Sequence, residues 1–253
     1  MKSDSQKRTV LVTGGGRGIG AACSLLCARQ GWAVAVNYAR DGAAARGVVE
    51  QVRAAGGTAL EVQADVADEA QVLAMFATID REVPPLGGLI NNAGVVDVAS
   101  RVDAMSVARL QRMFAINVFG SFVCARESVK RMSTAHGGAG GAIVNVSSVA
   151  ARLGSPGLYV DYAASKAAID TFTLGLAREV AAEGIRVNAV RPGIIETEIH
   201  ASGGQADRVV QLTPLLPMQR AGSAEEVAQA IVWLLGEGAS YTTGAVVDVT
   251  GGR

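Results

Sequence analysis

Tyr162 and Lys166 are the residues whose types and spacing best suit proton transfer. They are four residues apart at the start of a long helical pattern, YAASKAAIDTFTLGLAREV, so we expect both on one face of a helix. A tyrosine with its reference pKa of about 10 is a poor base at neutral pH, but a neighbouring ammonium group favours the phenolate and lowers that pKa. Tyr162 could then exchange a proton with a substrate oxygen.

Two serines precede this helix at the end of a predicted strand. The segment AIVNVSS ends in Ser147 and Ser148, and parallel sheets bind ligands at the carboxyl edge of their strands. A hydroxyl group there could orient a substrate carbonyl, and we favour Ser148 over Ser147. Taken singly, such residues are usually a packed ring, a solvated amine and a turn hydroxyl. Only their combination predicts a catalytic site.

A glycine-rich turn near the start of the sequence could bind phosphate. The segment TGGGRGIG lies between the first predicted strand and a helical pattern, and its Gly14, Gly18 and Gly20 have the spacing G-x-x-x-G-x-G. Glycines let the backbone approach a pyrophosphate, whose charge is stabilised by free N–H groups and by the positive end of the helix dipole. We therefore expect a dinucleotide cofactor at this turn.

The residues after the second predicted strand favour NADP(H). An acidic side chain is typical there when the cofactor has a free ribose 2′-hydroxyl, but the segment VNYARD has Asn37 at that place. Arg17 and Arg40 could pair with a 2′-phosphate, because guanidinium groups suit phosphate geometry, although either could also be a solvated surface charge. Asp41 is the observation against NADP(H), so NAD(H) stays the less favoured alternative.

Seven short apolar runs, separated by helical patterns, must position these groups. Because the runs are nearly continuous in apolar residues, we expect strands covered on both faces and joined by right-handed crossovers. The pattern predicts a single-domain, doubly wound α/β fold of the Rossmann type with a seven-stranded parallel sheet over 9–253, behind a flexible tail at 1–8. The runs are 9–14, 33–38, 59–66, 87–94, 142–148, 185–190 and 245–251.

The segment from about 194 to 222 is a long connection before the last helical pattern. Its length and its glycine and proline residues predict a mobile lid over the substrate, with a passive surface excursion as the alternative. His200 within this segment could touch the substrate, but a surface position or packing within the lid is the favoured interpretation.

Composition argues against several other classes of protein. The 253 residues include 23 basic and 23 acidic side chains without a long run of either sign, so nucleic acid and anionic membranes are not expected partners. No apolar run approaches the roughly 18 residues of a membrane span, and the polar start lacks the apolar segment of a signal peptide, so we expect a cytoplasmic protein. Cys23, Cys27 and Cys124 predict buried reduced thiols, and no metal site is expected.

The order of these motifs resembles the short-chain dehydrogenase/reductase family over essentially the whole sequence. Within that family the look-alikes are 3-oxoacyl-carrier-protein reductases and glucose 1-dehydrogenases. The matching pieces are TGGGRGIG, Asp65 in ADV, NNAG at 91–94, Asn117, VNVSS, YAASK and RPG at 191–193.

The resemblance implies a role for each matching residue. Tyr162 would be the general acid/base, Lys166 would bind the ribose and tune Tyr162, Ser148 would polarise the substrate oxygen, and Asn117 would hold a proton-relay water. Asp65 would contact the adenine end of the cofactor. The full set expected to contact the cofactor is Gly14, Arg17, Gly18, Ile19, Gly20, Asn37, Arg40, Asp65, Val66, Asn91, Ala93, Gly94, Tyr162, Lys166, Pro192, Gly193, Ile195 and Thr197.

One departure from the family pattern concerns the substrate pocket. The spacing from Ser148 to Tyr162 is one residue longer than the commonest spacing, and with Leu158 and Tyr159 nearby the extra residue should reshape the pocket. Tyr159 is the weaker alternative for the base, because no lysine follows it at the fourth position.

The expected activity is hydride transfer between the nicotinamide and a carbonyl or secondary alcohol carbon of a small molecule. The segment LTPLLPM favours an apolar or acyl substrate, whereas the lack of a basic patch disfavours an acidic carrier protein, so the substrate stays open. The resemblance also implies a homotetramer assembled through helices such as 106–133 and 162–182. A protein that binds NADP(H) as a sensor, without chemistry, is the rival from another class.

Overall fold

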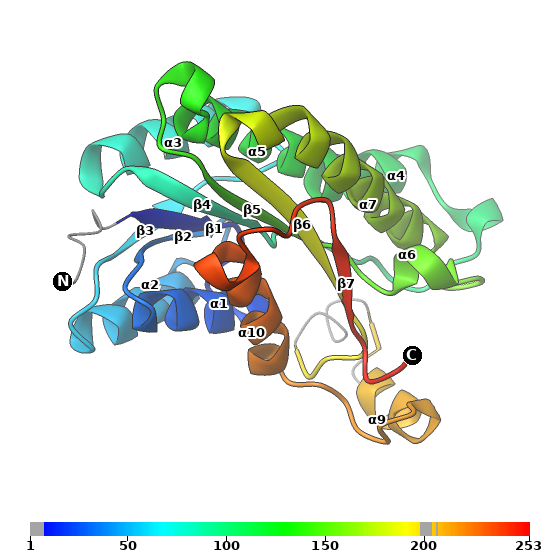
Figure 1. The fold of residues 1–253 in the computed structure, drawn as a ribbon. Coiled ribbons are helices and arrows are strands. Elements are labelled where there is room, and N and C mark those ends of the chain that lie inside the picture. The colour runs from blue at the N-terminus through cyan, green and yellow to red at the C-terminus, as the bar shows by residue number, and fades with distance from the viewer. Residues whose placement is uncertain (1–7, 198–203, 206) are drawn as a thin grey trace.

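Seven parallel strands form one sheet in the order β3-β2-β1-β4-β5-β6-β7 (Figure 1). The structure is a computed structural model that describes residues 8–197, 204–205 and 207–253. The predicted doubly wound fold and its seven strands are confirmed, although β1, β3, β4, β5 and β7 end before the predicted runs do. The strands are β1 (Thr9–Val12), β2 (Ala33–Tyr38), β3 (Ala59–Gln63), β4 (Leu86–Asn91), β5 (Gly141–Val146), β6 (Ile185–Pro192) and β7 (Val246–Val249).

Helices cover both faces of this sheet (Figure 1). One layer contains α1 (Gly18–Arg29), α2 (Gly42–Ala54) and α10 (Ala224–Leu235), and the other contains α3 (Glu69–Glu82), α5 (Gly120–Met132) and α7 (Val160–Val180). Each layer packs a separate apolar core against the sheet, so the strands are buried on both sides as their composition predicts. All three cysteines are free and buried, in agreement with the expectation of reduced thiols.

The order of the strands reverses between β1 and β4, and this is the switch point where doubly wound sheets bind ligands. The Thr13 hydroxyl ties the two strand ends together, because its Oγ1 accepts from the backbone N–H groups of Asn92 at 2.9 Å and Ala93 at 3.0 Å. The loop after β1 and the loop after β4 are thereby held side by side at the carboxyl edge of the sheet.

Four of the described α-helices begin with a side chain that caps their first N–H groups, and α1 is not among them. Asp41 caps α2, Asp68 caps α3, Ser106 caps α4 (Val107–Phe114), and Ser223 caps α10. Arg17 precedes α1 without a side-chain cap hydrogen bond, and the first turn of α1 contains no acidic residue. The positive end of α1 is therefore suited to an external anion.

The long connection after β6 is partly described. Ile194, Leu216 and Ala221 form a small apolar cluster, and Val209 and Leu212 near α9 (Arg208–Leu212) pack against it. His200 and the rest of 198–203, together with residue 206, lie outside the described residues, as does 1–7 of the predicted tail. The mobile lid therefore stays a prediction.

The described ranges contain neither a helix that could span a membrane nor a cluster of metal-ligating side chains. Within 8–197, 204–205 and 207–253, none of the helices has both the length and the apolar character that a membrane span requires. Over the same residues, no group of three or more His, Cys, Asp or Glu side chains is arranged to hold a metal ion.

Candidate active site

The glycine turn has the backbone geometry that its composition predicts. Gly14 and Gly18 have φ values of 61° and 49°, in the left-handed region that favours glycine. A Cβ atom on Gly20 would lie 2.2 Å from the carbonyl oxygen of Gly14, so the first turn of α1 packs directly against the loop. This close approach leaves the start of α1 facing the carboxyl edge of the sheet.

Asn37 supports this turn from below, which differs from its expected place beside a ribose. Its side chain is 1% exposed, and its Oδ1 accepts from the backbone N–H of Gly14 at 3.2 Å. Its Nδ2 donates to the carbonyl oxygens of Val62 at 3.3 Å and Ala64 at 3.0 Å. Asn37 therefore joins the turn to the ends of β2 and β3, and its polar atoms point into the protein.

Arg17 and Arg40 are exposed near the end of β2, and the carboxylate of Asp41, which follows Arg40 in the sequence, caps a helix. Asp41 accepts from the backbone N–H of Ala44 at 3.0 Å as the cap of α2. Arg17 lies 3.9 Å from Asp41 through its Nη1, with 61% of its side chain exposed, and Arg40 is exposed as well. The cap hydrogen bond keeps Asp41 at the start of α2, whereas both guanidinium groups face solvent beside the turn.

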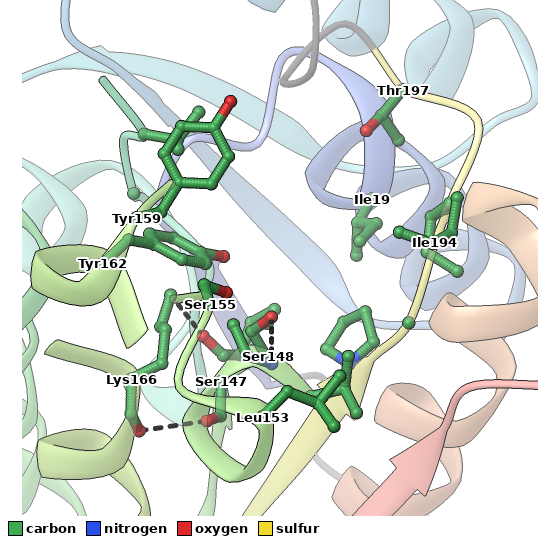
Figure 2. A pocket seen from close by; sticks show the side chains of 18 of the residues that line it. Ile19, Ser147, Ser148, Leu153, Ser155, Tyr159, Tyr162, Lys166, Ile194 and Thr197 are labelled. Atoms are coloured by element: carbon green, nitrogen blue, oxygen red, sulfur yellow. Dashed lines mark hydrogen bonds between the residues drawn. The ribbon is translucent and has the colours of Figure 1, made fainter. Parts of the chain in front are cut away.

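A pocket of about 150 Å³ opens at the carboxyl edge of the sheet. Figure 2 shows Tyr162, Ser148 and Lys166 on one side of it, and Ile19, Ile194 and Thr197 on the other. Of the residues expected from the sequence, the pocket brings together Ile19, Gly94, Ser148, Tyr162, Lys166, Pro192, Gly193, Ile195 and Thr197.

The remaining expected residues surround the pocket without lining it. Gly14, Arg17, Gly18 and Gly20 form the adjacent turn, while Asn37 and Arg40 lie at or just beyond the end of β2. Asp65 and Val66 follow β3, where an Asp65 carboxylate oxygen accepts from the backbone N–H of Ala67 at 3.0 Å. The others are Asn91 and Ala93 at the end of β4, and Asn117 behind the pocket.

The asparagines at the end of β4 differ from the expectation. Asn91 is 4% exposed, and its Nδ2 donates to the carbonyl oxygen of Ser121 and to the Oδ1 of Asn145. Asn92 lines the pocket in its place and donates to the carbonyl oxygens of Thr13 and Gly14. Successive residues of a strand point to opposite faces of the sheet. A shift of one residue in the predicted position therefore exchanges the residue that lines the pocket with the one that points into the protein.

The catalytic candidates converge from β5 and α7. Lys166 is 5% exposed, and its Nζ donates to the carbonyl oxygen of Val146 at 2.7 Å and lies 5.7 Å from the centroid of the Tyr162 ring. The Ser147 hydroxyl donates to the backbone carbonyl of Lys166 at 3.1 Å, whereas the Ser148 hydroxyl hydrogen-bonds with Tyr162. The geometry thus favours Ser148 over Ser147 as the partner of Tyr162.

Burial, more than the lysine, governs the acid–base chemistry of this group. It raises the pKa of Tyr162 above its ordinary value, and the hydrogen bond with Ser148 opposes this rise only in part. Burial also lowers the pKa of Lys166 to about 8, with Asp170 opposing the decrease. The expectation that Lys166 brings the pKa of Tyr162 below its reference value is therefore not met in this structure, where burial has the largest effect and the hydrogen bond with Ser148 opposes it.

Asn117 occupies an irregular turn between α4 and α5. The predicted continuous helix over 106–133 contains a π-helical turn, η2 (Ala115–Phe119), and such turns often occur at functional sites. The Asn117 side chain accepts from the Val95 N–H at 2.8 Å, donates to the Val95 carbonyl at 3.0 Å and donates to Ser165 Oγ at 3.1 Å. It therefore fixes the loop after β4 against α7.

The extra residue before α7 lies in a loop that shapes the substrate side of the pocket. Ser155 has a φ of 46°, which is a strained conformation for a residue other than glycine, and it lines the pocket together with Tyr159. Tyr159 is 6% exposed, and its ring lies next to that of Tyr162 (Figure 2). The sequence predicted a reshaped pocket but did not identify Val96, Leu153, Ser155, Ile194 and Arg253 as further lining residues.

The sequence was also compared with a family model and with curated proteins. Residues 14–253 match the model of a family described as Enoyl-(Acyl carrier protein) reductase. A relative from Escherichia coli K12, an uncharacterized oxidoreductase named YgfF, is 58% identical over 96% of this chain and 98% of its own length. A 3beta-hydroxysteroid dehydrogenase 1 from Eggerthella lenta is 38% identical over 100% of this chain and 95% of its own.

A solved structure is similar to this chain over almost its whole length. A blue fluorescent protein from a metagenomic library, determined in complex with NADPH, superposes with a TM-score of 0.89. Its sequence is 32% identical, and the match covers 98% of both chains.

Proposed function

The chain belongs to the short-chain dehydrogenase/reductase family of oxidoreductases, and on that premise we propose that it transfers a hydride between NADP(H) and the carbonyl or secondary alcohol of a small apolar molecule. The observation that carries the proposal is the meeting of Tyr162, Ser148 and Lys166 in one pocket beside the glycine turn. No other part of the described chain combines these groups.

The residues around the pocket fit a dinucleotide. The uncapped start of α1 would receive the pyrophosphate, and Gly18 leaves space next to Thr197, whose Cγ2 would lie 3.3 Å from an added Cβ. Gly94 leaves a similar space, because its Cβ would approach Asn117 Oδ1 at 3.4 Å and Lys166 Nζ at 3.5 Å. When bound, the nicotinamide would supply or accept the hydride at its C4 atom.

The side chains of the pocket would handle the oxygen and its proton. Since burial raises the pKa of Tyr162, this residue keeps its proton at neutral pH and can donate it to a carbonyl oxygen during reduction. The Ser148 hydroxyl, next to Tyr162, would donate to the same oxygen as negative charge develops there. Lys166, charged below about pH 8, would add a positive charge behind Tyr162. Asn117 keeps the loop after β4 fixed, and the proton-relay water assigned to it stays part of the proposal.

Two features support NADP(H) over NAD(H). Arg17 and Arg40 are exposed beside the glycine turn, where guanidinium groups could bind a 2′-phosphate. Asn37, at the end of β2, supplies no charge for a free 2′-hydroxyl, and the Asp41 carboxylate is engaged as the cap of α2.

The substrate side of the pocket favours an apolar molecule. Its walls include Val96, Leu153 and Ile194 together with the Tyr159 ring, whereas polar groups gather around Ser148 and Tyr162. Such a lining buries an apolar body and orients one oxygen. The relative named as a 3beta-hydroxysteroid dehydrogenase has a name consistent with a substrate of this chemistry.

A cofactor titration followed by a carbonyl panel tests this proposal. We expect NADPH to bind more tightly than NADH, as followed by cofactor fluorescence, and at least one apolar ketone or aldehyde to cause oxidation of NADPH. Tighter binding of NADH would contradict the roles of Arg17 and Arg40. Binding of NADPH without oxidation by any carbonyl would favour the sensor interpretation instead.

A further inference from the structure

Helix α7 contains two buried carboxylates that the proposed mechanism does not use. Asp161 pairs with Arg109 of α4 at 2.7 Å, and Asp170 pairs with Arg191 of β6 at 2.9 Å. The Asp161 side chain is fully buried and that of Asp170 is 11% exposed. Buried carboxylates are costly unless they are paired, so both pairs stabilise the position of α7, but only Asp170 lies one turn from Lys166.

The pairing of Asp170 with Arg191 is incomplete. The Nε and Nη2 of Arg191 both approach Oδ2 of Asp170 at 2.9 Å. The other oxygen, Oδ1, is buried and has no hydrogen-bond partner among the residues that the structure describes. At Asp161, in contrast, Arg109 Nε reaches one oxygen at 2.7 Å and Arg109 Nη2 the other at 3.2 Å. An unpartnered carboxylate oxygen in the interior is costly, which suggests that the charge of Asp170 has a further use.

Arg191 is itself held by a chain of alternating charges that reaches the wall of the pocket. Its Nη1 contacts Asp248 of β7 at 3.3 Å, and Asp248 also pairs with Arg152 of α6 (Ala150–Leu153). Arg191 directly precedes Pro192 and Gly193, which line the pocket. These ion pairs therefore hold the Asp170 carboxylate against β6 and β7 beside the pocket.

Lys166 has few charged neighbours that could stabilise its ammonium group. The acidic groups on the surrounding elements have other partners, because Arg191 and Arg152 engage Asp248 and the Ser133 hydroxyl donates to Glu183. The turn η2 and strand β5 contribute no titratable side chain. The titratable and charged groups around it are Tyr162 and Asp170 on α7, Arg191 on β6, Asp248 on β7, Arg152 on α6, Arg109 on α4, Glu183 after α7, and Arg253 at the pocket.

We propose that Asp170 is a positioning residue that serves as the internal counter-ion of Lys166, acting through space while Arg191 holds its carboxylate in place. No direct ion pair joins Lys166 to Asp170 in the described chain, and the Nζ atom instead donates to Val146. In agreement with this role, Asp170 is the group whose charge opposes the effect of burial on the pKa of Lys166. The importance of a charged Lys166 for turnover rests on the proposed function, but the coupling of the two side chains does not.

The coupling can be measured by urea unfolding as a function of pH. The pKa of Lys166 is about 8 in the folded chain and near the reference value of about 10.4 in the unfolded chain. Between these pH values the unfolded state binds more protons, so Lys166 makes the free energy of unfolding rise with pH over that window. Asp170→Asn should move the start of the rise to lower pH by roughly one pH unit.

A double-mutant cycle with matched controls separates coupling from general damage. Lys166→Met should abolish the rise, and adding Asp170→Asn to Lys166→Met should leave the slope unchanged. Asp161→Asn removes the other buried carboxylate of α7 and should leave the pH window in place. Asp170→Glu retains the carboxylate, so the free energy of unfolding should rise over the same pH window as in the unaltered chain. An equal slope change by Asp170→Asn with and without Lys166 would overturn the inference.

Kinetics then test the consequence for turnover. With NADPH and the best carbonyl of the panel, Asp170→Asn should move the alkaline decrease of kcat/KM to lower pH by roughly one pH unit, and Asp161→Asn should not move it. An unmoved profile, with a lower rate at every pH, would overturn the positioning role. If no carbonyl oxidises NADPH with the unaltered chain, the proposed function fails, while the unfolding cycle still decides whether Asp170 is the counter-ion of Lys166.

Discussion

Tyr162 and Ser148 form the part of the pocket that would contact a substrate oxygen, and their neighbour Ser147 has a different task. The Ser147 hydroxyl is buried and bonded to the backbone of α7, while the Ser148 hydroxyl lies beside Tyr162. Of the two adjacent serines, one therefore bonds to the backbone of the helix and the other to the hydroxyl of Tyr162.

This division predicts different results for two alanine variants. Ser148→Ala should lower kcat on the order of 100-fold with little change in stability, because it removes a donor to the developing oxyanion. Ser147→Ala should lower the free energy of unfolding by about 1 kcal/mol and retain most of the activity, because it removes one internal hydrogen bond. Steady-state rates and urea unfolding of both variants provide the check. A larger loss of kcat in Ser147→Ala would exchange the two assignments.

The acid–base pair shows which residue properties could be predicted from the sequence. The spacing of Tyr162 and Lys166 was sufficient to predict that both lie on one face of a helix, because residues four apart are neighbours there. In the structure, both line the same pocket. The direction of the pKa shift of Tyr162 was not predictable, because it depends on burial by residues from several distant segments. For the same reason, the internal hydrogen bonds of Asn37 and Asn91 became evident only in the folded chain.

At the scale of elements, the glycine turn and α1 form a unit that depends on close backbone contact. Gly20→Ala would place a Cβ 2.2 Å from the carbonyl oxygen of Gly14, and the backbone would have to move. We expect this variant to lose about 1–3 kcal/mol of stability and to bind NADPH more weakly.

A helical glycine elsewhere provides the matched control for this variant. Gly47 lies within α2, and an added Cβ would meet nothing within 4 Å. Gly47→Ala should therefore stabilise the chain by up to about 1 kcal/mol and leave NADPH binding unchanged. Thermal unfolding and cofactor titration of the two variants test the account, which would be contradicted if Gly20→Ala bound NADPH as well as Gly47→Ala.

The regular elements were predictable because their signals are local. Apolar runs identified all seven strands, and a strand-to-helix context identified the glycine turn. The irregular elements were not predictable in detail. The π-helical turn at Ala115–Phe119 and the loop with Ser155 at a φ of 46° depend on contacts with distant segments, such as those of Asn117 with Val95 and Ser165.

For the molecule as a whole, the outer surface of the α5–α7 layer exposes several large apolar side chains. Phe119 is 62% exposed, Phe122 is 45% exposed, and Phe122 stacks on Phe172 of α7 with ring centroids 3.8 Å apart. Leu174 and Val107 are exposed on the same helical layer. Clustered apolar side chains on a surface usually mark an interface, so this surface supports the proposal of a homotetramer.

Sedimentation tests this interface directly. We expect the unaltered chain to sediment as a tetramer and Phe122→Glu to sediment as a smaller species, because the substitution places charges in the proposed contact. Leu73→Glu is a suitable control, since Leu73 is similarly exposed at 43% but lies on α3 rather than on α5 or α7. A monomer in the unaltered chain, or equal effects of the two substitutions, would contradict the assignment. The cytoplasmic location stays a prediction.

The central claim is that Tyr162 exchanges the proton that accompanies hydride transfer, and its most direct test is the turnover of Tyr162→Phe. The matched control is Tyr159→Phe, which removes a hydroxyl from the neighbouring ring in the same pocket. With NADPH and the best carbonyl of the panel, the account predicts a loss of at least about 100-fold in kcat for Tyr162→Phe, a retained affinity for NADPH, and a much smaller change for Tyr159→Phe. Turnover by Tyr162→Phe close to that of the unaltered chain would contradict it.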